Sequence, residues 1–101
     1  MKSVLITGCS SGIGLCIAKG LKEKGYRVFA SARTSDDVKN LQNLGFDSLL
    51  LDLSSSESIN AAVFKLFEMT DNLYALINNG AYGQAGALED ISRDTLEKQF
   101  Q

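Results

Sequence analysis

One glycine-rich run constrains the fold of this chain more than any other segment: Thr7-Gly8-Cys9-Ser10-Ser11-Gly12-Ile13-Gly14. An apolar, strand-like stretch, Ser3-Val4-Leu5-Ile6, precedes it, and a helical pattern of apolar residues starts at Ile13. A strand that breaks at glycines and continues as a helix brings free backbone N–H groups to one point, where the positive end of the helix dipole also lies. The run therefore predicts an anion site between a first strand and a first helix.

Each glycine of the run has a distinct expected role. Gly8 permits a tight turn, Gly12 lets the backbone approach a bound pyrophosphate, and Gly14 allows the helix to lie close to the strand. The pattern gains weight from its context, because a second strand follows about twenty residues later. The candidate binding residues of this run are Gly8, Ser10, Ser11, Gly12, Ile13 and Gly14.

Strand-like and helical patterns alternate along the rest of the chain. Strands are expected at residues 3–7, 27–31, 48–51 and 73–78, with helices between them and a loop of small residues at 79–87. Helices that connect such strands form right-handed crossovers over a parallel sheet. The predicted fold class is α/β: the first half of a Rossmann-like doubly wound sheet, βαβαβαβ, with strand order 3-2-1-4 and an incomplete helix at its end.

The pattern also predicts helix caps and inward faces. Ser35 is expected to cap the second helix, and the segment from Ser54 to Glu57 has the spacing of a capping box for the third. The apolar residues expected to face the sheet are Ile13, Ile17, Ala18 and Leu21 in the first helix, Val38, Leu41 and Leu44 in the second, and Ile59, Ala62, Val63, Leu66 and Phe67 in the third.

The end of the chain favours an incomplete domain. Ser92 can cap a further helix, with Leu96 and Phe100 four residues apart, but the sequence stops at Gln101 without a helix-ending signal. The fourth strand would also remain an exposed apolar edge, which proteins usually avoid. Residues 1–101 are therefore interpreted as one partial, truncated domain, for which self-association is expected.

Composition argues against several other classes of function. A net charge of −2, with ten scattered Lys and Arg residues, gives no electrostatic footprint for DNA or RNA. The chain has no histidine and only two cysteines, so no metal site is expected. No stretch approaches the roughly 20 apolar residues of a membrane span. We expect a cytoplasmic protein with reduced thiols, in which Cys9 is a small loop residue, with a reactive thiol as the alternative.

Three motifs, in order along the whole chain, resemble those of the classical short-chain dehydrogenases/reductases. The glycine-rich run matches the Thr-Gly-x-x-x-Gly-x-Gly nucleotide motif of that family. Leu51-Asp52-Leu53 is similar to the element after the third strand, in which the aspartate contacts adenine. Asn78-Asn79-Gly80-Ala81 resembles the Asn-Asn-Ala-Gly motif after the fourth strand, with its last two residues exchanged, and residues 83–90 resemble the approach to the dimer-forming helix.

The resemblance implies a nicotinamide dinucleotide cofactor and a partial NAD(P)-binding domain over residues 1–101. It adds five candidate cofactor-binding residues: Asp52, Leu53, Asn79, Gly80 and Ala81. Two simpler interpretations stay open. Asp52 could simply cap or start the turn before Ser54, without a role in binding. The paired asparagines could be ordinary turn formers, because asparagine tolerates a left-handed backbone.

The end of the second strand favours NADP(H) over NAD(H). Dinucleotide-binding folds place an acidic residue there to bind the ribose 2′-OH, or an arginine nearby to accommodate a 2′-phosphate. In this chain Ala32 occupies the acidic position and Arg33 follows it. A guanidinium can bind a phosphate through two hydrogen bonds, whereas a carboxylate would repel it. Arg33 is thus a candidate cofactor-binding residue, with a solvated surface arginine as the alternative.

No residue of this chain is assigned a catalytic role. The family's catalysis uses an asparagine, a serine and a Tyr-x-x-x-Lys pair, all expected beyond Gln101, and none of the three tyrosines here has a lysine four positions later. The leading hypothesis is the cofactor-binding half of an oxidoreductase that acts on a small carbonyl or alcohol. The alternatives are a dinucleotide-binding module without catalysis and an inactive fragment that associates through its open sheet edge.

Overall fold

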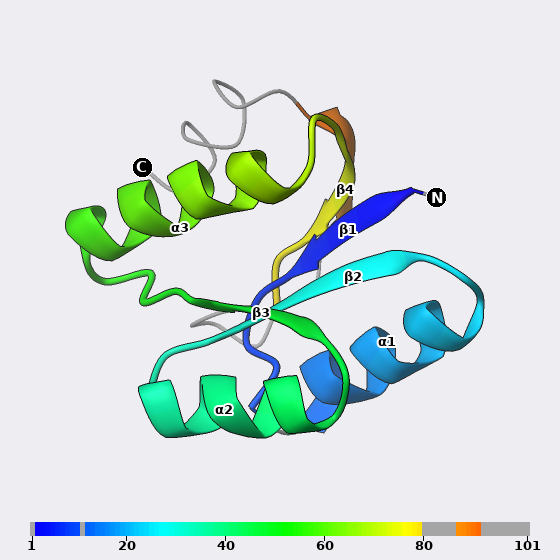
Figure 1. Ribbon diagram of the computed structural model, residues 1–101, viewed down its shortest axis with the longest axis horizontal. Helices are drawn as coiled ribbons and strands as arrows, with labels where there is room; N and C mark the ends of the chain where they lie inside the picture. Colours follow the sequence, from blue (N-terminus) through cyan, green and yellow to red (C-terminus); the bar gives the residue numbers. More distant parts are fainter. Residues whose placement is uncertain (1, 11, 80–86, 92–101) are drawn as a thin grey trace.

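The computed structural model describes residues 2–10, 12–79 and 87–91, along which strands and helices alternate (Figure 1). The elements are β1 (Ser3–Ile6), α1 (Gly12–Glu23), β2 (Arg27–Ala32), α2 (Ser35–Asn43), β3 (Asp47–Leu50), α3 (Ser56–Met69), β4 (Leu73–Ile77) and β5 (Ala87–Ile91). The bounds of β1 to β4 differ from the expected ones by no more than one residue at either end. The alternation of strand and helix expected from the sequence is confirmed as far as β4.

The strands form one sheet in the order β3-β2-β1-β4-β5. β1 pairs in parallel with β2 and with β4, and β2 pairs in parallel with β3, so the predicted order 3-2-1-4 is confirmed. In the register, Ile6 lies opposite Ala30 on one side and Ile77 on the other. The carboxyl ends of β1, β2 and β4 therefore reach the same edge of the sheet.

The prediction of an open edge at β4 is wrong. β5 pairs with β4 in antiparallel orientation, from Leu73 opposite Ile91 to Ile77 opposite Ala87. The backbone N–H and C=O groups expected to be unpaired at this edge thus find partners within the same chain, because β5, which begins ten residues after the end of β4, pairs with it. The expected loop at 79–87 ends where β5 begins, and the helix expected from Ser92 lies outside the described residues.

Helices cover both faces of the sheet, with α3 on one face and α1 and α2 on the other (Figure 1). Successive strand residues point to opposite faces, so each strand contributes to two cores. The core under α3 holds the strand residues Leu5, Phe29, Leu49, Leu73 and Leu76. The core under α1 and α2 holds the strand residues Val4, Ile6, Val28, Ala30, Ala32 and Ala75.

Two apolar residues that were expected to face the sheet are exposed. In α1 the buried positions are Gly14 and Ala18, four residues apart, and Ile13 lies about 100° around the helix from that line, with 65% of its surface exposed. Leu44 is 50% exposed because α2 has already ended at Asn43. The inward stripe of α3 is as expected, with Ile59, Ala62, Val63 and Leu66 buried.

Two expected helix caps are also displaced by one residue. Thr34, rather than Ser35, caps α2, because its hydroxyl accepts a hydrogen bond from Asp37 N at 3.3 Å. Ser55, rather than Ser54, caps α3 by accepting from Ser58 N at 3.2 Å. In a run of adjacent hydroxyl residues the chain direction before the helix decides which one can reach the free N–H groups.

Among the described helices α3 is the longest, with 14 residues, and none of them combines the length and the apolar character that a bilayer crossing requires.

Candidate functional site

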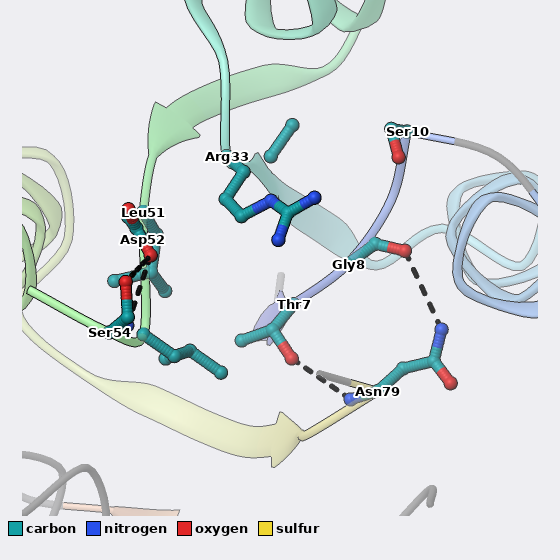
Figure 2. Close-up of a pocket in the computed structure, with 10 residues that line it drawn as sticks. Thr7, Gly8, Ser10, Arg33, Leu51, Asp52, Ser54 and Asn79 are labelled. Carbon is teal, nitrogen blue, oxygen red and sulfur yellow. Dashed lines mark hydrogen bonds between the residues drawn. The ribbon is translucent and has the colours of Figure 1, made fainter. Parts of the chain in front are cut away.

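A pocket of about 320 Å³ opens at the edge of the sheet where the parallel strands end. Figure 2 shows that its lining comes from four separate segments. Thr7, Gly8 and Ser10 belong to the segment between β1 and α1, here called the glycine loop (residues 7–11). The other lining residues are Ala32 and Arg33 after β2, residues 51–54 after β3, and Asn79 after β4. The arrangement brings together motifs that the sequence separates by up to about seventy residues.

The glycine loop has the backbone geometry that its sequence predicts. Gly8 and Gly12 both have a φ of 67°, in the left-handed region that favours glycine. A β-carbon at Gly12 would meet no atom within 4 Å, so the backbone there faces open space at the start of α1. A β-carbon at Gly14 would lie 2.7 Å from Asn79 Nδ2 and would overlap the Gly8 carbonyl oxygen. Gly14 is therefore the residue that lets α1 pack closely against the glycine loop.

Hydrogen bonds join the glycine loop to the segment after β4. The Thr7 hydroxyl donates to Asn78 Oδ1 and accepts from Asn79 N, both at 2.9 Å. Asn79 Nδ2 also lies 3.5 Å from the carbonyl oxygen of Gly8, as Figure 2 shows. The paired asparagines thus help to hold the glycine loop in place.

Cys9 lies inside the glycine loop and is fully buried. Its thiol donates to the Ile6 carbonyl oxygen at 3.3 Å. Burial raises the pKa of Cys9 to about 11, and a backbone hydrogen bond from Ser31 offsets only part of that effect. The reactive-thiol hypothesis required the opposite, because a nucleophilic cysteine needs a lowered pKa and access to solvent.

Arg33 and Asp52 supply opposite charges on two sides of the pocket. Arg33 follows β2 directly and is exposed, and Figure 2 shows its guanidinium group directed toward the middle of the pocket. Asp52 Oδ1 accepts hydrogen bonds from Ser54 Oγ at 2.6 Å and from Ser54 N at 3.0 Å. These bonds lower the pKa of Asp52, and the positive charge of Arg33 adds a smaller effect in the same direction. Asp52 is therefore ionised at neutral pH.

The structure places half of the twelve predicted site residues around one pocket. The pocket lining includes Gly8, Ser10, Arg33, Asp52, Leu53 and Asn79. Gly12, Ile13 and Gly14 form the start of α1, next to the glycine loop but outside the pocket lining. Ser11, Gly80 and Ala81 lie outside the described residues.

Sequence reasoning missed Thr7 and Ser54 as contributors to the site. Thr7 begins the glycine-rich motif and Ser54 follows Leu53, but each makes its contact through a side chain whose partner the motif does not specify. Within the described part of the chain, no three His, Cys, Asp or Glu side chains are placed to hold a metal ion.

Comparisons with known proteins agree with this geometry. A family model for short chain dehydrogenases matches residues 2–101. The uncharacterized oxidoreductase YbbO of Escherichia coli (strain K12) is 49% identical over 100 residues, which cover 98% of this chain and 37% of YbbO. The chain therefore spans less than half of that relative's length.

Two solved structures resemble the fold. A short-chain dehydrogenase from Streptomyces avermitilis superposes with a TM-score of 0.69 at 26% identity, covering 79% of this chain and 30% of that one. A protein from Brucella melitensis described as a ribose-5-phosphate isomerase superposes with a TM-score of 0.74 at 25% identity, covering 79% of this chain and 32% of the other.

Proposed function

This chain belongs to the short-chain dehydrogenase/reductase family, and we propose on that basis that it forms the NADP(H)-binding part of an oxidoreductase. In the complete protein the reaction would be the reduction of a small carbonyl compound or the oxidation of the corresponding alcohol. The bound nicotinamide cofactor supplies the hydride chemistry of such a reaction. The residues described here bind and orient that cofactor.

The observation that carries this proposal is the open backbone at the junction of the glycine loop and α1. Free N–H groups at a helix N-terminus favour an anion, and a side chain at Gly12 would stand in its path. Among the described residues no atom lies within 4 Å of the position that a β-carbon at Gly12 would occupy, so a diphosphate can approach the backbone there. Ser10, two residues earlier, lines the pocket and can donate its hydroxyl.

The two charged side chains are placed to bind different groups of the adenosine half of the dinucleotide. The ionised carboxylate of Asp52 can accept a hydrogen bond from the adenine amino group, and Ser54 holds that carboxylate in place. The Arg33 guanidinium can bind a 2′-phosphate. These two residues point toward the same pocket from β2 and from the turn after β3, which is where the adenosine half would lie.

The preference for NADP(H) rests on the end of β2. Ala32 is buried with 2% of its surface exposed and offers no group that could bind a ribose hydroxyl. Arg33 is the charged residue that immediately follows, and its side chain enters the pocket. A 2′-phosphate would therefore meet a cation and no carboxylate at this position.

Titration of the intact protein with NADPH and with NADH tests the proposal. The unmodified protein should bind NADPH more tightly. Arg33→Asp should reverse the preference, with the ratio of the two dissociation constants changing by at least about tenfold, since a hydrogen-bonded charge contributes about 1.5–3 kcal/mol. Lys24→Asp is the matched control, because it reverses a charge at the far end of α1 and lines no part of the pocket.

The control should leave the ratio unchanged. Equal ratios in the unmodified protein and in Arg33→Asp would contradict the assignment of Arg33. The absence of saturable binding of either nucleotide by the intact, folded protein would contradict the proposal as a whole.

A further inference from the structure

Ser31 is a buried polar residue in a strand whose other interior residues are apolar. It has 1% of its surface exposed and stands two positions before Arg33. Its hydroxyl donates to the carbonyl oxygen of Ile6, the last residue of β1, at 3.1 Å. Its own carbonyl oxygen accepts from Cys9 N in the glycine loop at 2.9 Å. Ser31 therefore holds the end of β1 and the glycine loop at the same time.

Cys9 and Ser31 are bonded to each other through their backbones, and both side chains share the Ile6 carbonyl oxygen as acceptor. The Ile6 carbonyl oxygen accepts both the Ser31 hydroxyl and the Cys9 thiol, the latter at 3.3 Å. The glycine loop is thus bound to the end of β2 through the backbone N–H of Cys9. The side chains of Ser31 and Cys9 add a second, indirect connection, because both donate to the carbonyl oxygen of Ile6. A shift of this loop relative to β2 would leave buried polar groups without partners, which is energetically costly.

The same end of β2 carries the side chain that would recognise the 2′-phosphate. The next residue, Ala32, accepts a hydrogen bond from Leu51 N at 2.9 Å, so the path of β2 up to Arg33 is fixed on its other side as well. The distance between the diphosphate-binding loop and the Arg33 side chain therefore depends on the bonds that Ser31 makes.

We propose that Ser31 is a positioning residue for cofactor selectivity, which it sets by fixing the glycine loop relative to Arg33. The proposal rests on the function proposed above. NADPH would use both anchors, the loop for its diphosphate and Arg33 for its 2′-phosphate, whereas NADH would use the loop alone. A loosened connection between the anchors weakens NADPH binding more than NADH binding, because only NADPH requires the two to be in register.

Ser31→Ala in the intact protein tests this inference through the ratio of the NADPH and NADH dissociation constants. The preference for NADPH should fall by about fivefold, which corresponds to the loss of one hydrogen bond. Ser31→Cys, which keeps a donor of similar size, should restore part of the preference. It also serves as the second variant if Ser31→Ala does not fold.

Ser48→Ala is the matched control. Ser48 is a buried serine on the adjacent strand β3, opposite Ala30 in the register, and its hydroxyl also donates to a backbone carbonyl, that of Phe46, at 3.2 Å. It contacts neither the glycine loop nor Arg33, so its loss should lower the melting temperature without changing the nucleotide ratio.

An unchanged ratio in a folded Ser31→Ala protein, or an equal fall in the ratio in Ser48→Ala, would overturn the inference. Either result would leave the proposed function intact, because the unmodified protein would still bind NADPH. The absence of nucleotide binding by the unmodified protein would instead overturn the proposed function, and this inference with it.

Discussion

The hydroxyl oxygen of Thr7 lies 2.9 Å from the backbone nitrogen of Asn79 and accepts its hydrogen bond. The same hydroxyl donates to Asn78 Oδ1, so one side chain uses both its donor and an acceptor position across 72 residues of sequence. Thr7 has 1% of its surface exposed, and water cannot replace these contacts. One threonine thus fixes the end of β1 to the end of β4 at the entrance of the pocket.

Thr7→Val should destabilise the protein by about 2 kcal/mol. The substitution keeps the shape of the side chain but leaves the backbone N–H of Asn79 and the side chain of Asn78 without this partner in a largely buried place. Urea denaturation followed by circular dichroism measures the change. Thr7→Ser retains the hydroxyl and should recover most of the loss, and a Thr7→Val protein as stable as the unmodified one would contradict the role assigned to these bonds.

Two glycines of the same helix should respond in opposite directions to alanine. At Gly14 the new methyl group meets the backbone of Gly8 and the side chain of Asn79, so we expect a destabilisation of about 1–3 kcal/mol and weaker nucleotide binding. At Gly20 an added methyl group would meet no other part of the described structure within 4 Å, and alanine should stabilise α1 by about 0.5–1 kcal/mol. Denaturation midpoints of the two variants provide the measurement, and a Gly14→Ala protein of unchanged stability would show that α1 can move away.

The carboxyl group of Asp52 should titrate below its ordinary pKa of 3.8, chiefly because of the two hydrogen bonds from Ser54. Ser54→Ala removes the hydroxyl bond, so the pKa of Asp52 should rise toward that ordinary value. Its lowered pKa means that this carboxylate stabilises the folded state above pH 3.8 and loses that effect as the pH falls through its folded-state value.

Carboxyl chemical shifts followed by NMR during an acid titration measure this pKa directly. Ser56→Ala is a suitable control, since Ser56 is an exposed serine in the first turn of α3 and makes no bond to Asp52 among the described contacts. An Asp52 pKa that is the same in the unmodified protein and in Ser54→Ala would contradict this account of the turn.

The parts of the fold that sequence could predict are those specified locally. Apolar periodicity placed β1 to β4 within one residue and predicted a helix between each pair of successive strands, and the conformational demands of Gly8 and Gly12 identified the glycine-rich run. The strand order followed from general rules for crossover connections. Local signals of this kind act between neighbours in the chain, so they can be recognised without knowing which distant segments meet.

The remainder depends on contacts between distant segments. Nothing in residues 87–91 alone indicates that they pair with β4, because their partner is defined by the rest of the sheet. Ser31 has the same limitation, since a lone serine in an apolar strand is informative only when Ile6 and Cys9 are known to lie against it. The exposure of Ile13 was missed because helix rotation is set by close packing at Gly14 rather than by the size of the apolar side chain.

The two cysteines should differ sharply in their reaction with alkylating reagents. Cys16 lies exposed on α1, whereas Cys9 is buried and its pKa is raised from 9.0 to about 11. Near neutral pH, iodoacetamide should therefore modify Cys16 in the folded protein and reach Cys9 only after unfolding. Peptide mass spectrometry at successive times distinguishes the two sites, and equal rates of modification in the folded state would contradict the buried position of Cys9.

The raised pKa of Cys9 also predicts how stability changes with pH. The folded state holds the thiol proton of Cys9 more tightly than the unfolded state does. The stabilisation of the folded state by this group is therefore complete below pH 9.0 and is lost as the pH rises toward about 11. Cys9→Ser keeps a donor to Ile6 but has no group that titrates in this range. The free energy of unfolding of the unmodified protein should therefore fall relative to that of Cys9→Ser as the pH rises from 9.0 to about 11. All other side chains are common to the two proteins and cancel in the difference, so a difference independent of pH would show that Cys9 is solvated in the folded state.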